Sequence, residues 1–400
     1  MVPQDDKGSR LLSCCLFSTI GRKYDSAEYR PSGFDYLRIS LTISIVLFHS
    51  IVLCHEQSWQ FFLVDTQWKL PLAFLIPSFF ALSGFLIASS LERSTIAGFI
   101  GLRIIRIVPA LAVDTLIKIL IVGPLFTVLP LRLYFSTRET WTYLLNIVGK
   151  IHYRLPGVFL HNPVPEDLNG QLWTIPWEVA CYAIILILAI VGILRSRAWF
   201  LTLAVVVPIL LLTILTPIYP TLFGPKPQFV APTNIDLILS FLAGVAIYKY
   251  REYIPHSPVI AAFAVIGYAI MTNTQYASVL TSPFVAYITI WLGVTNYRRI
   301  FLIRSGDYTY GIYIYHSMLQ QVIVSLGILT WYVVFGMSLV LVIALAAMSW
   351  SLVEKPALSL RKYVAKRAPQ RDAALNRVLT GLGSGDGAPP IQRSTLESGA

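Results

Sequence analysis

Apolar residues form long runs along this chain, and short polar or charged segments separate the runs. A helix that crosses a bilayer needs about 20 mostly apolar residues. Ten runs are long enough to predict such helices, each placed to within a few residues. They are residues 34–54, 71–91, 107–129, 171–194, 198–217, 232–249, 257–272, 277–295, 307–329 and 331–353. We therefore expect an all-α, polytopic membrane protein with about ten transmembrane helices.

The Lys and Arg residues between these runs indicate how the chain is oriented. The last two runs are joined so tightly, around residues 329–331, that they predict a hairpin. An even number of spans puts both termini on one side of the membrane. With a cytoplasmic N-terminus, 23 Lys and Arg residues lie on the cytoplasmic side and six on the other side. Because cytoplasmic loops carry the excess of Lys and Arg, we expect both termini in the cytoplasm.

Three regions follow from this topology. Residues 1–32 are expected to form a cytoplasmic N-terminal tail, residues 33–360 the membrane domain, and residues 361–400 a basic and then disordered cytoplasmic tail. Inside the membrane domain, residues at about 130–170 form a long outer segment. Within it, residues 141–151 have apolar positions at helical spacing, which predicts an amphipathic helix on the membrane surface.

Composition and charge narrow the function classes. The 400 residues are 56% hydrophobic and 13% charged, whereas soluble domains are about 45–50% apolar and about 25% charged. This excludes a soluble enzyme with a water-facing surface. The net charge of +11 follows mostly from the topology, so we expect no nucleic-acid partner. Cys14, Cys15, Cys54 and Cys181 show neither a disulfide framework nor zinc-ligand spacing, and we expect no metal site.

Ionisable residues inside the expected spans are candidates for function, because each costs roughly a few kcal/mol to insert. The first span carries Asp35, Arg38 and His49, and their spacing places them on one face of a helix. Asp35 and Arg38 are three residues apart and can pair. An equally simple interpretation is an interfacial ion pair plus a histidine that hydrogen-bonds to a neighbouring helix. Geometry alone leaves both interpretations open.

Polar groups elsewhere add further candidates. Arg103 and Arg106 form a cationic pair at the inner membrane edge, where they either anchor the chain or clamp an anionic group such as a phosphate. Glu178 lies well inside the fourth apolar run, and His316 lies deeper than an interfacial tyrosine belt requires. Residues 77–86 mix small and aromatic side chains, which favours close helix packing.

Six short motifs carrying these residues stand in order along the chain. They are Asp35-Tyr36-Leu37-Arg38 followed by His49, Phe79-Phe80-Ala81-Leu82-Ser83-Gly84-Phe85-Leu86, Arg103-Ile104-Ile105-Arg106-Ile107, Leu172-Trp173-Thr174-Ile175-Pro176-Trp177-Glu178, Thr309-Tyr310-Gly311-Ile312-Tyr313-Ile314-Tyr315-His316, and Glu354-Lys355-Pro356. Together they resemble the acyltransferase-3 family of integral membrane O-acyltransferases. The resemblance covers residues 33–360. Its departures, at Pro176 and Tyr315, fall on none of the His, Arg or Glu positions.

This resemblance implies transfer of an acyl group, usually acetyl from acetyl-CoA, to a sugar hydroxyl. Acetyl-CoA or another acyl-CoA would then be a co-substrate, with no tightly bound cofactor. The acceptor would be a glycan or a lipid-linked saccharide of the cell envelope or of a secreted molecule. The protein would lie in the lipid bilayer of a bacterial inner membrane. The acceptor sugar, the choice between acetyl and succinyl, and the oligomeric state stay open.

The residues suit such a reaction. A sugar hydroxyl is a poor nucleophile at neutral pH, so a base is needed, and we expect His49 to be that base. Asp35 lies about 21 Å from His49 along the helix axis, which is too far for a partner, so Asp35 orients or balances Arg38. Whether His49 takes a proton from the acceptor or carries the acyl group itself stays open.

The remaining candidates fall into two groups. We expect Arg103, Arg106 and Ser83 to bind the donor. Glu178 or Tyr313 would position the acceptor or stabilise the oxyanion, and the sequence does not choose between them. His316 is either a second acid or base, or a structural hydrogen-bonding group. Trp173 and Tyr310 are further candidates that either contact the substrate or support residues that do.

A transporter is the competing class. Ten spans with buried charges suit a proton-coupled exporter of a glycan or glycolipid. The sequence shows no repeated half and no matching pair of Gly- or Pro-broken helices, which speaks against it. A receptor or scaffold, the third class, would make the buried charges dispensable.

Overall fold

The computed structural model describes residues 18–55, 58–64, 66–211, 213, 233–274, 276–298 and 306–361. This part of the chain is all-helical and contains no β-strand, only two isolated backbone bridges. The all-α prediction is therefore confirmed for the described residues. Residues 1–17 of the expected N-terminal tail and nearly all of the expected C-terminal tail lie outside them, as do Cys14, Cys15 and the end of the expected span 198–217. Cys54 and Cys181 are buried and free.

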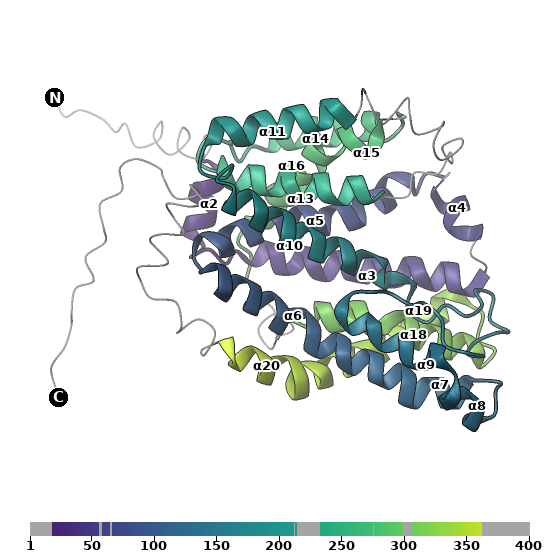
Figure 1. Cartoon of the computed structure of the whole chain (residues 1–400). Helices are drawn as coiled ribbons and strands as arrows, with labels where there is room; N and C mark the ends of the chain where they lie inside the picture. Colours follow the sequence, from purple (N-terminus) through teal and green to yellow (C-terminus); the bar gives the residue numbers. More distant parts are fainter. Residues whose placement is uncertain are drawn as a thin grey trace, which may run out of the picture.

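Long helices lie side by side in one bundle (Figure 1). Ten of them overlap the ten apolar runs: α3 (Ser32–His55), α5 (Lys69–Glu92), α6 (Ile96–Ile117), α10 (Ile175–Ile190), α11 (Arg197–Leu210), α13 (Asn234–Lys249), α14 (Pro258–Met271), α16 (Ser282–Gly293), α18 (Thr309–Ser325) and α19 (Trp331–Ser349). As expected, α18 and α19 form a hairpin, and its turn includes Gly327 with φ +85°.

Short elements extend these helices or connect them. They are α2 (Ile20–Ser26), α4 (Ser58–Val64), α7 (Gly123–Phe126), α8 (Leu131–Ser136), α9 (Arg138–Thr142), α15 (Ala277–Leu280), α20 (Lys355–Ser359), the 3-10 helices η2 (Tyr143–Val148) and η3 (Gly170–Thr174), and the π-helices η1 (Lys118–Val122) and η5 (Trp350–Glu354). Figure 1 shows α2 and α20 at one end of the bundle and α4 and α8 at the other. We name these the α2–α20 end and the α4–α8 end.

Four helical segments are long and apolar enough to cross a bilayer: Ser32–His55, Lys69–Glu92, Gly170–Ile190 and Trp331–Ser359. Three shorter apolar helices, α11, α14 and α16, accompany them. The chain is thus a helical membrane protein. A topology of ten spans with cytoplasmic termini stays a prediction from the apolar runs and the Lys and Arg distribution.

The third helix differs from its expected boundaries. It begins at Ile96 rather than near residue 107, because the Thr95 hydroxyl accepts a hydrogen bond from the Gly98 N–H at 3.1 Å and caps the helix. Arg103 and Arg106 therefore lie within α6, not before it, and Pro109 lies inside the helix. The two arginines interrupt the apolar run, which is why hydrophobicity alone placed the start too late.

The outer segment also differs from expectation. Residues 141–151 do not form one amphipathic α-helix but the end of α9, the 3-10 helix η2 and a turn at Gly149 with φ +83°. Asn146 is buried and its side chain accepts a hydrogen bond from the His152 N–H at 2.6 Å, which folds the chain back on itself. Trp141 and Val148 are exposed.

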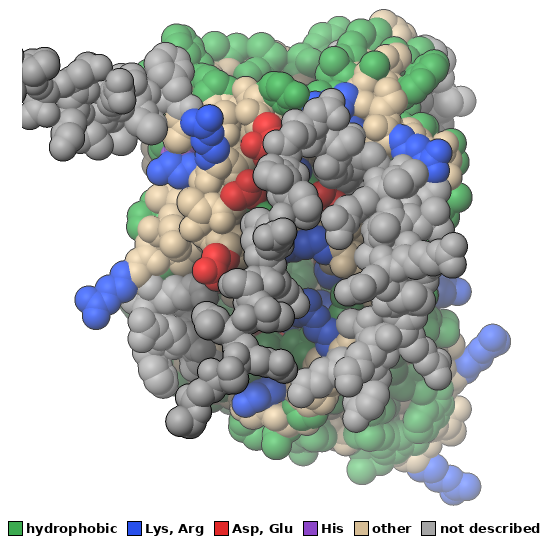
Figure 2. All heavy atoms as spheres, turned by 90° about the vertical axis from the view of Figure 1, so that its left-hand side faces the viewer, with side chains coloured by type: hydrophobic (Ala, Val, Ile, Leu, Met, Phe, Trp, Pro, Cys, Tyr) green, Lys and Arg blue, Asp and Glu red, His purple; other side chains and the backbone are tan. Residues whose placement is uncertain are grey.

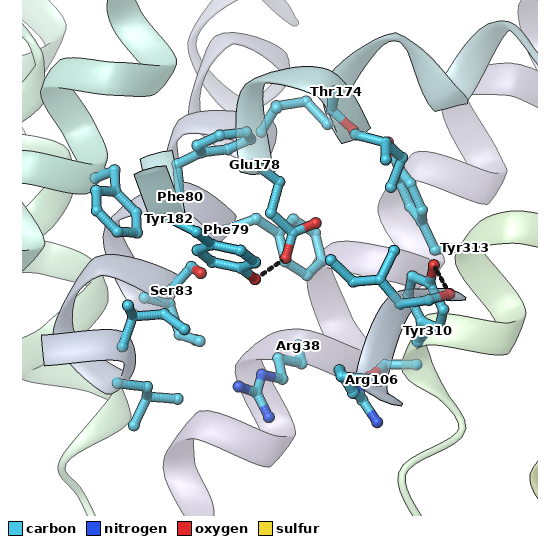
Figure 3. Close-up of a pocket in the computed structure, with 18 of the residues that line it drawn as sticks. Arg38, Phe79, Phe80, Ser83, Arg106, Thr174, Glu178, Tyr182, Tyr310 and Tyr313 are labelled. Atoms are coloured by element: carbon cyan, nitrogen blue, oxygen red, sulfur yellow. Dashed lines mark hydrogen bonds between the residues drawn. The ribbon is translucent and has the colours of Figure 1, made fainter. Parts of the chain in front are cut away.

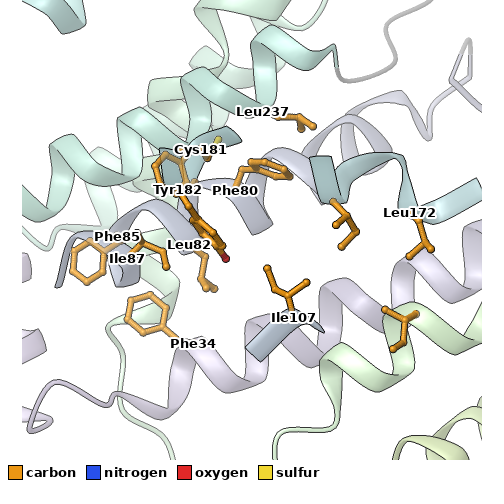
Figure 4. Close-up of a cluster of buried hydrophobic side chains, with 14 of the residues drawn as sticks. Phe34, Phe80, Leu82, Phe85, Ile87, Ile107, Leu172, Cys181, Tyr182 and Leu237 are labelled. Atoms are coloured by element: carbon orange, nitrogen blue, oxygen red, sulfur yellow. The ribbon is translucent and has the colours of Figure 1, made fainter. Parts of the chain in front are cut away.

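Small residues let α5 and α13 meet backbone to backbone. A Cβ atom at Gly84 would lie 2.0 Å from the Phe241 carbonyl oxygen, and one at Gly244 would lie 2.0 Å from the Ala81 carbonyl oxygen. The close packing expected for residues 77–86 is confirmed. Around this contact, buried side chains such as Phe80 and Phe85 form the main apolar core (Figure 4).

Replacing Gly84 by alanine is expected to lower the melting temperature of the purified protein. The added methyl group must push α5 away from the α13 backbone, and such overpacking costs about 1–3 kcal/mol. Gly336→Ala on α19 is the matched control, because a Cβ atom there meets nothing within 4 Å. Equal melting temperatures for the two variants would show that α5 and α13 do not touch as described.

Candidate active site

A cavity of about 180 Å³ lies inside the bundle between α3, α5, α6, α10 and α18. Seven of the expected site residues line it: Arg38, Ser83, Arg103, Arg106, Glu178, Tyr310 and Tyr313. Figure 3 shows Arg38 and Arg106 on one side of the cavity and Glu178 across from them. Lys and Arg side chains are also visible near the centre of the α2–α20 end (Figure 2). The cavity thus combines cations, a carboxylate and hydroxyl groups within apolar helices.

Asp307, which the sequence analysis missed, joins two of the cavity's arginines. An Arg106 Nη2 atom donates to Asp307 Oδ2 at 2.7 Å, and Arg38 Nη1 lies 3.9 Å from the same oxygen. Arg106 also lies 3.9 Å from a carboxylate oxygen of the buried Glu354. The Thr309 hydroxyl donates to the other Asp307 oxygen at 2.6 Å. Arg38 and Arg106 are therefore already matched by carboxylates of this chain.

Replacing Asp307 by asparagine is expected to lower the melting temperature by several degrees, because two partly buried guanidinium groups lose their shared counter-charge. Asp35→Asn is a useful comparison, since Asp35 lines a small neighbouring cavity together with Arg38 and Asp307. The measurement is thermal unfolding in detergent. An unchanged melting temperature for Asp307→Asn would contradict the proposed bridging role of this carboxylate.

Arg103 differs from Arg106, although both were expected to act as one clamp. Its guanidinium carbon lies 5.7 Å from the ring centroid of Phe99 and 5.8 Å from that of Tyr182. Its Nε atom is buried and has no hydrogen-bond partner within the described part of the chain. Its Nη2 atom makes only a long contact of 3.4 Å with the Ser90 hydroxyl. Of the two arginines, Arg103 is the one whose donor capacity is left for an anion.

Glu178 lies in the first turn of α10, and its carboxylate accepts a hydrogen bond from the Tyr182 hydroxyl one turn later (Figure 3). Pro176, a departure from the family pattern, also lies in this first turn. Proline is tolerated there because the first N–H groups of a helix have no partner within the helix. The departure therefore leaves the position of Glu178 intact.

The tyrosine hydroxyl groups that line the cavity are already engaged. Tyr313 donates to the Gln171 carbonyl at 2.6 Å, so it must accept from the Thr174 hydroxyl at 2.7 Å. Tyr310 donates to the Ile107 carbonyl at 3.1 Å, and its ring lies 5.6 Å from the Arg106 guanidinium carbon. Neither proton is free for an oxyanion, which favours positioning roles for both tyrosines.

His49 and His316 form a direct hydrogen-bonded pair between α3 and α18. His49 Nδ1 lies 2.9 Å from His316 Nε2, and His316 Nδ1 lies 2.8 Å from the Tyr313 carbonyl. His316 is fully buried, whereas His49 is half-buried. The nearby Gln320 amide donates to the Val46 carbonyl at 2.8 Å and so fixes the register of the two helices.

The hydrogen-bond pattern assigns the tautomer of each ring. A carbonyl only accepts, so His316 Nδ1 carries the proton and its Nε2 is an acceptor when the ring is neutral. His49 Nδ1 must then donate to His316 Nε2. The remaining nitrogen, His49 Nε2, is left with a lone pair. This is the nitrogen that a general base or a nucleophile uses.

The structure separates His49 from the other charged residues of α3. Arg38 and Thr42 line the cavity, whereas His49 lies farther along the helix, about 16 Å from Arg38 by helix rise. Asp35 lies farther still from His49. The expectation that Asp35, Arg38 and His49 share one helix face holds, but they do not form one constellation. Trp173, in η3, packs against the apolar core and does not line the cavity.

A buried ion pair inside α6 and η1 was also missed. Lys118 Nζ lies 2.7 Å from Asp114 Oδ2, and both side chains are buried. The sequence signal for this pair is two opposite charges four residues apart within an apolar run. Among the described residues, no group of three His, Cys, Asp or Glu side chains could hold a metal ion.

Buried amides tie the outer segment to α18 next to the histidine pair. The Gln321 amide donates to the Val164 carbonyl at 2.9 Å and to the Asp167 carbonyl at 2.7 Å. The Asn162 amide donates back to the Gln321 side chain at 2.6 Å. Burial raises the pKa of the Asp167 carboxyl group, which lies in this segment. The segment is thus fixed near the histidine pair.

Comparisons with known proteins relate the sequence of this chain to acyltransferases. Residues 32–349 match the family model described as an acyltransferase domain, that of acyltransferase-3. An O-acetyl transferase of Shigella phage Sf6 is 25% identical over 343 residues, which cover 82% of this chain and 96% of that protein. Nodulation protein 10 of Rhizobium leguminosarum bv. viciae is 25% identical over 378 residues, which cover 87% and 99%. No solved structure matches.

Proposed function

Because the chain belongs to the acyltransferase-3 family and is an O-acyltransferase, we propose that it moves an acetyl group from cytoplasmic acetyl-CoA to a hydroxyl group of a cell-envelope or secreted glycan. One observation carries this proposal. The His49–His316 pair leaves His49 Nε2 unprotonated on the half-buried residue of the pair. A base in that state is what an acceptor hydroxyl needs.

His49 acts as the general base. Its Nε2 takes the proton of the acceptor hydroxyl as that oxygen attacks the thioester carbonyl carbon. When the tetrahedral intermediate collapses, the carbon–sulfur bond breaks and the same proton passes to the leaving thiolate. His316 keeps the His49 ring in the required tautomer throughout. Attack by Nε2 itself, with an acyl-histidine intermediate, is the second route, and the experiments below separate the two.

We assign the donor to the α2–α20 end of the cavity, and the arginines there support this assignment. Coenzyme A carries several phosphates, and Arg103 has a buried Nε without a partner among the described residues. Arg103 lies in the first half of α6, which begins at the α2–α20 end (Figure 1). The distance of about 16 Å between Arg38 and His49 suits a long, thin donor that reaches along the helix.

The other cavity residues support the acceptor side. Glu178 is the carboxylate that faces the cavity and accepts from Tyr182, so we assign it to acceptor positioning. Tyr313 holds His316 through its carbonyl group, and Tyr310 supports Arg106. Ser83 lines the donor side of the same cavity, and Trp173 stabilises η3. Family membership favours this enzyme over the proton-coupled transporter.

Vesicles with the protein in one orientation test the proposal. Labelled acetyl-CoA is added on the α2–α20 side, and envelope glycan is supplied on the other side. We expect base-labile label in the glycan, and succinyl-CoA in a parallel reaction tests the choice of acyl group. Glycan that crosses the membrane without gaining an ester would instead support a transporter and overturn the proposal.

A further inference from the structure

A second cavity, of about 330 Å³, lies between α6, η2 and α10. We call it the α6–α10 groove. Its lining is apolar except for Arg103, Tyr182 and the backbone at Gly149, and includes Ile104, Val108, Val148, Val179 and Leu186. The volume falls in the range of small-molecule sites, about 300–1,000 Å³. The groove is therefore large enough to hold a ligand and suits a hydrocarbon.

The rim of the groove is exposed and apolar. Exposed fractions reach 41% at Ile100, 54% at Ile104, 47% at Val179 and 76% at Val148. α10 belongs to a segment that is long and apolar enough to span a bilayer. Exposed aliphatic side chains on such a helix face lipid tails. The groove thus opens sideways into the hydrocarbon of the membrane.

The length of the groove matches one leaflet. Its lining along α6 extends from Phe99 to Leu111, and these twelve steps span about 18 Å at the rise of an α-helix. The hydrocarbon core of a bilayer is about 30 Å thick, so one leaflet contributes about 15 Å. A single lipid chain laid along α6 would therefore fit the groove from end to end.

Arg103 supplies a positive charge at the place where the headgroup of such a lipid would lie. The Arg103 guanidinium lies over the ring of Phe99, toward the α2–α20 end of the groove, and also contacts the ring of Tyr182. Its buried Nε has no partner among the described residues. A buried, unpaired donor on a charged group is costly unless an anion satisfies it. A phosphate diester at the end of a hydrocarbon chain supplies that anion.

We propose that the α6–α10 groove binds one hydrocarbon chain of an anionic phospholipid from the leaflet at the α2–α20 end, with the lipid phosphate hydrogen-bonded to Arg103. Arg103 also lines the cavity between α3, α5, α6, α10 and α18. Its guanidinium has five N–H donors, enough to serve a lipid phosphate from the groove and a donor phosphate from that cavity. The lipid site itself does not depend on the proposed reaction, and its test needs no acyl transfer.

Native mass spectrometry of the protein in mixed micelles tests this site. Phosphatidylglycerol and a diacylglycerol with identical chains, which lacks the phosphate, are supplied in equal amounts. We expect one retained phosphatidylglycerol, preferred about tenfold, as expected for one charge-assisted hydrogen bond. Arg103→Gln should remove the preference. Equal retention of both lipids by the wild type would overturn the proposal, as would a dimer spectrum in which the groove is filled by a second copy.

Variants in the groove lining distinguish lipid binding in the groove from non-specific contact between lipid and the protein surface. Val179→Trp and Ile104→Trp fill the groove from α10 and from α6, and each should lower retention about tenfold. Ile187→Trp is the control, because Ile187 is 57% exposed on α10 but does not line the groove. Melting temperatures check that each variant folds. Folded groove variants that retain the lipid as well as the control would contradict the proposal.

Discussion

Replacing His49 by alanine is expected to lower kcat/KM for acetyl transfer by about 10²–10⁴-fold, the usual contribution of a general base. The variant removes the ring nitrogen of the His49–His316 pair whose lone pair the hydrogen bonds within the pair do not use. Arg38 and Arg103 are untouched, so donor binding should not change. Initial rates of ester formation, at equal amounts of protein in the membrane, give the comparison.

His55→Ala provides the matched control for this variant. His55 ends the same helix about 9 Å beyond His49 by helix rise, and its ring lies against Trp59 with ring centroids 4.1 Å apart. It should retain the wild-type rate. Equal loss in the two variants would indicate damage to α3 rather than to the base. Wild-type activity in His49→Ala would remove His49 from the reaction.

Replacing His316 by leucine is expected to lower kcat by about 10²-fold or more with little change in the KM for the donor. The loss of a group that fixes the tautomer of a catalytic histidine costs up to about 10⁴-fold in well-studied enzymes. His316→Gln places an amide oxygen near the position of Nε2, and should recover part of the rate. The measurement is the full rate dependence on donor concentration.

The contrast between these two variants separates positioning from packing. His316 is fully buried, so leucine keeps most of its apolar contacts but cannot accept from His49 Nδ1. If leucine and glutamine variants fold equally well and lose the same activity, the hydrogen bond to His49 is not what matters. If His316→Leu keeps the wild-type kcat, the hydrogen bond that fixes the His49 tautomer does not contribute to catalysis.

The helical runs and most of the cavity were predictable from the sequence. Each of the ten apolar runs overlaps a helix, because the backbone of a lipid-embedded segment must form its hydrogen bonds within the segment. Seven expected site residues line one cavity, because the motifs that carry them lie on α3, α5, α6, α10 and α18. The hairpin of α18 and α19 followed from its short turn.

The pairings between helices were not predictable. Asp307 lies in a loop, where a carboxylate is ordinary, and only the packing of α3, α6 and α18 brings it to Arg38 and Arg106. The contact between His49 and His316 joins residues 267 positions apart. Because Arg103 and Arg106 are three residues apart, the sequence predicted the same role for both. In the structure, however, the two side chains have different neighbours. Local patterns show which side chains share a helix face, but not what that face meets.

A single-turnover experiment tests the central claim, that His49 activates the acceptor hydroxyl, most directly. Labelled acetyl-CoA is bound to excess enzyme in vesicles, glycan is added, and label is followed on donor, protein and glycan in the wild type and in His49→Ala. We expect direct passage of label from donor to glycan in the wild type, and label that stays on the bound donor in His49→Ala. Label that reaches the glycan at the wild-type rate in His49→Ala, or that first accumulates on the wild-type protein, would contradict it.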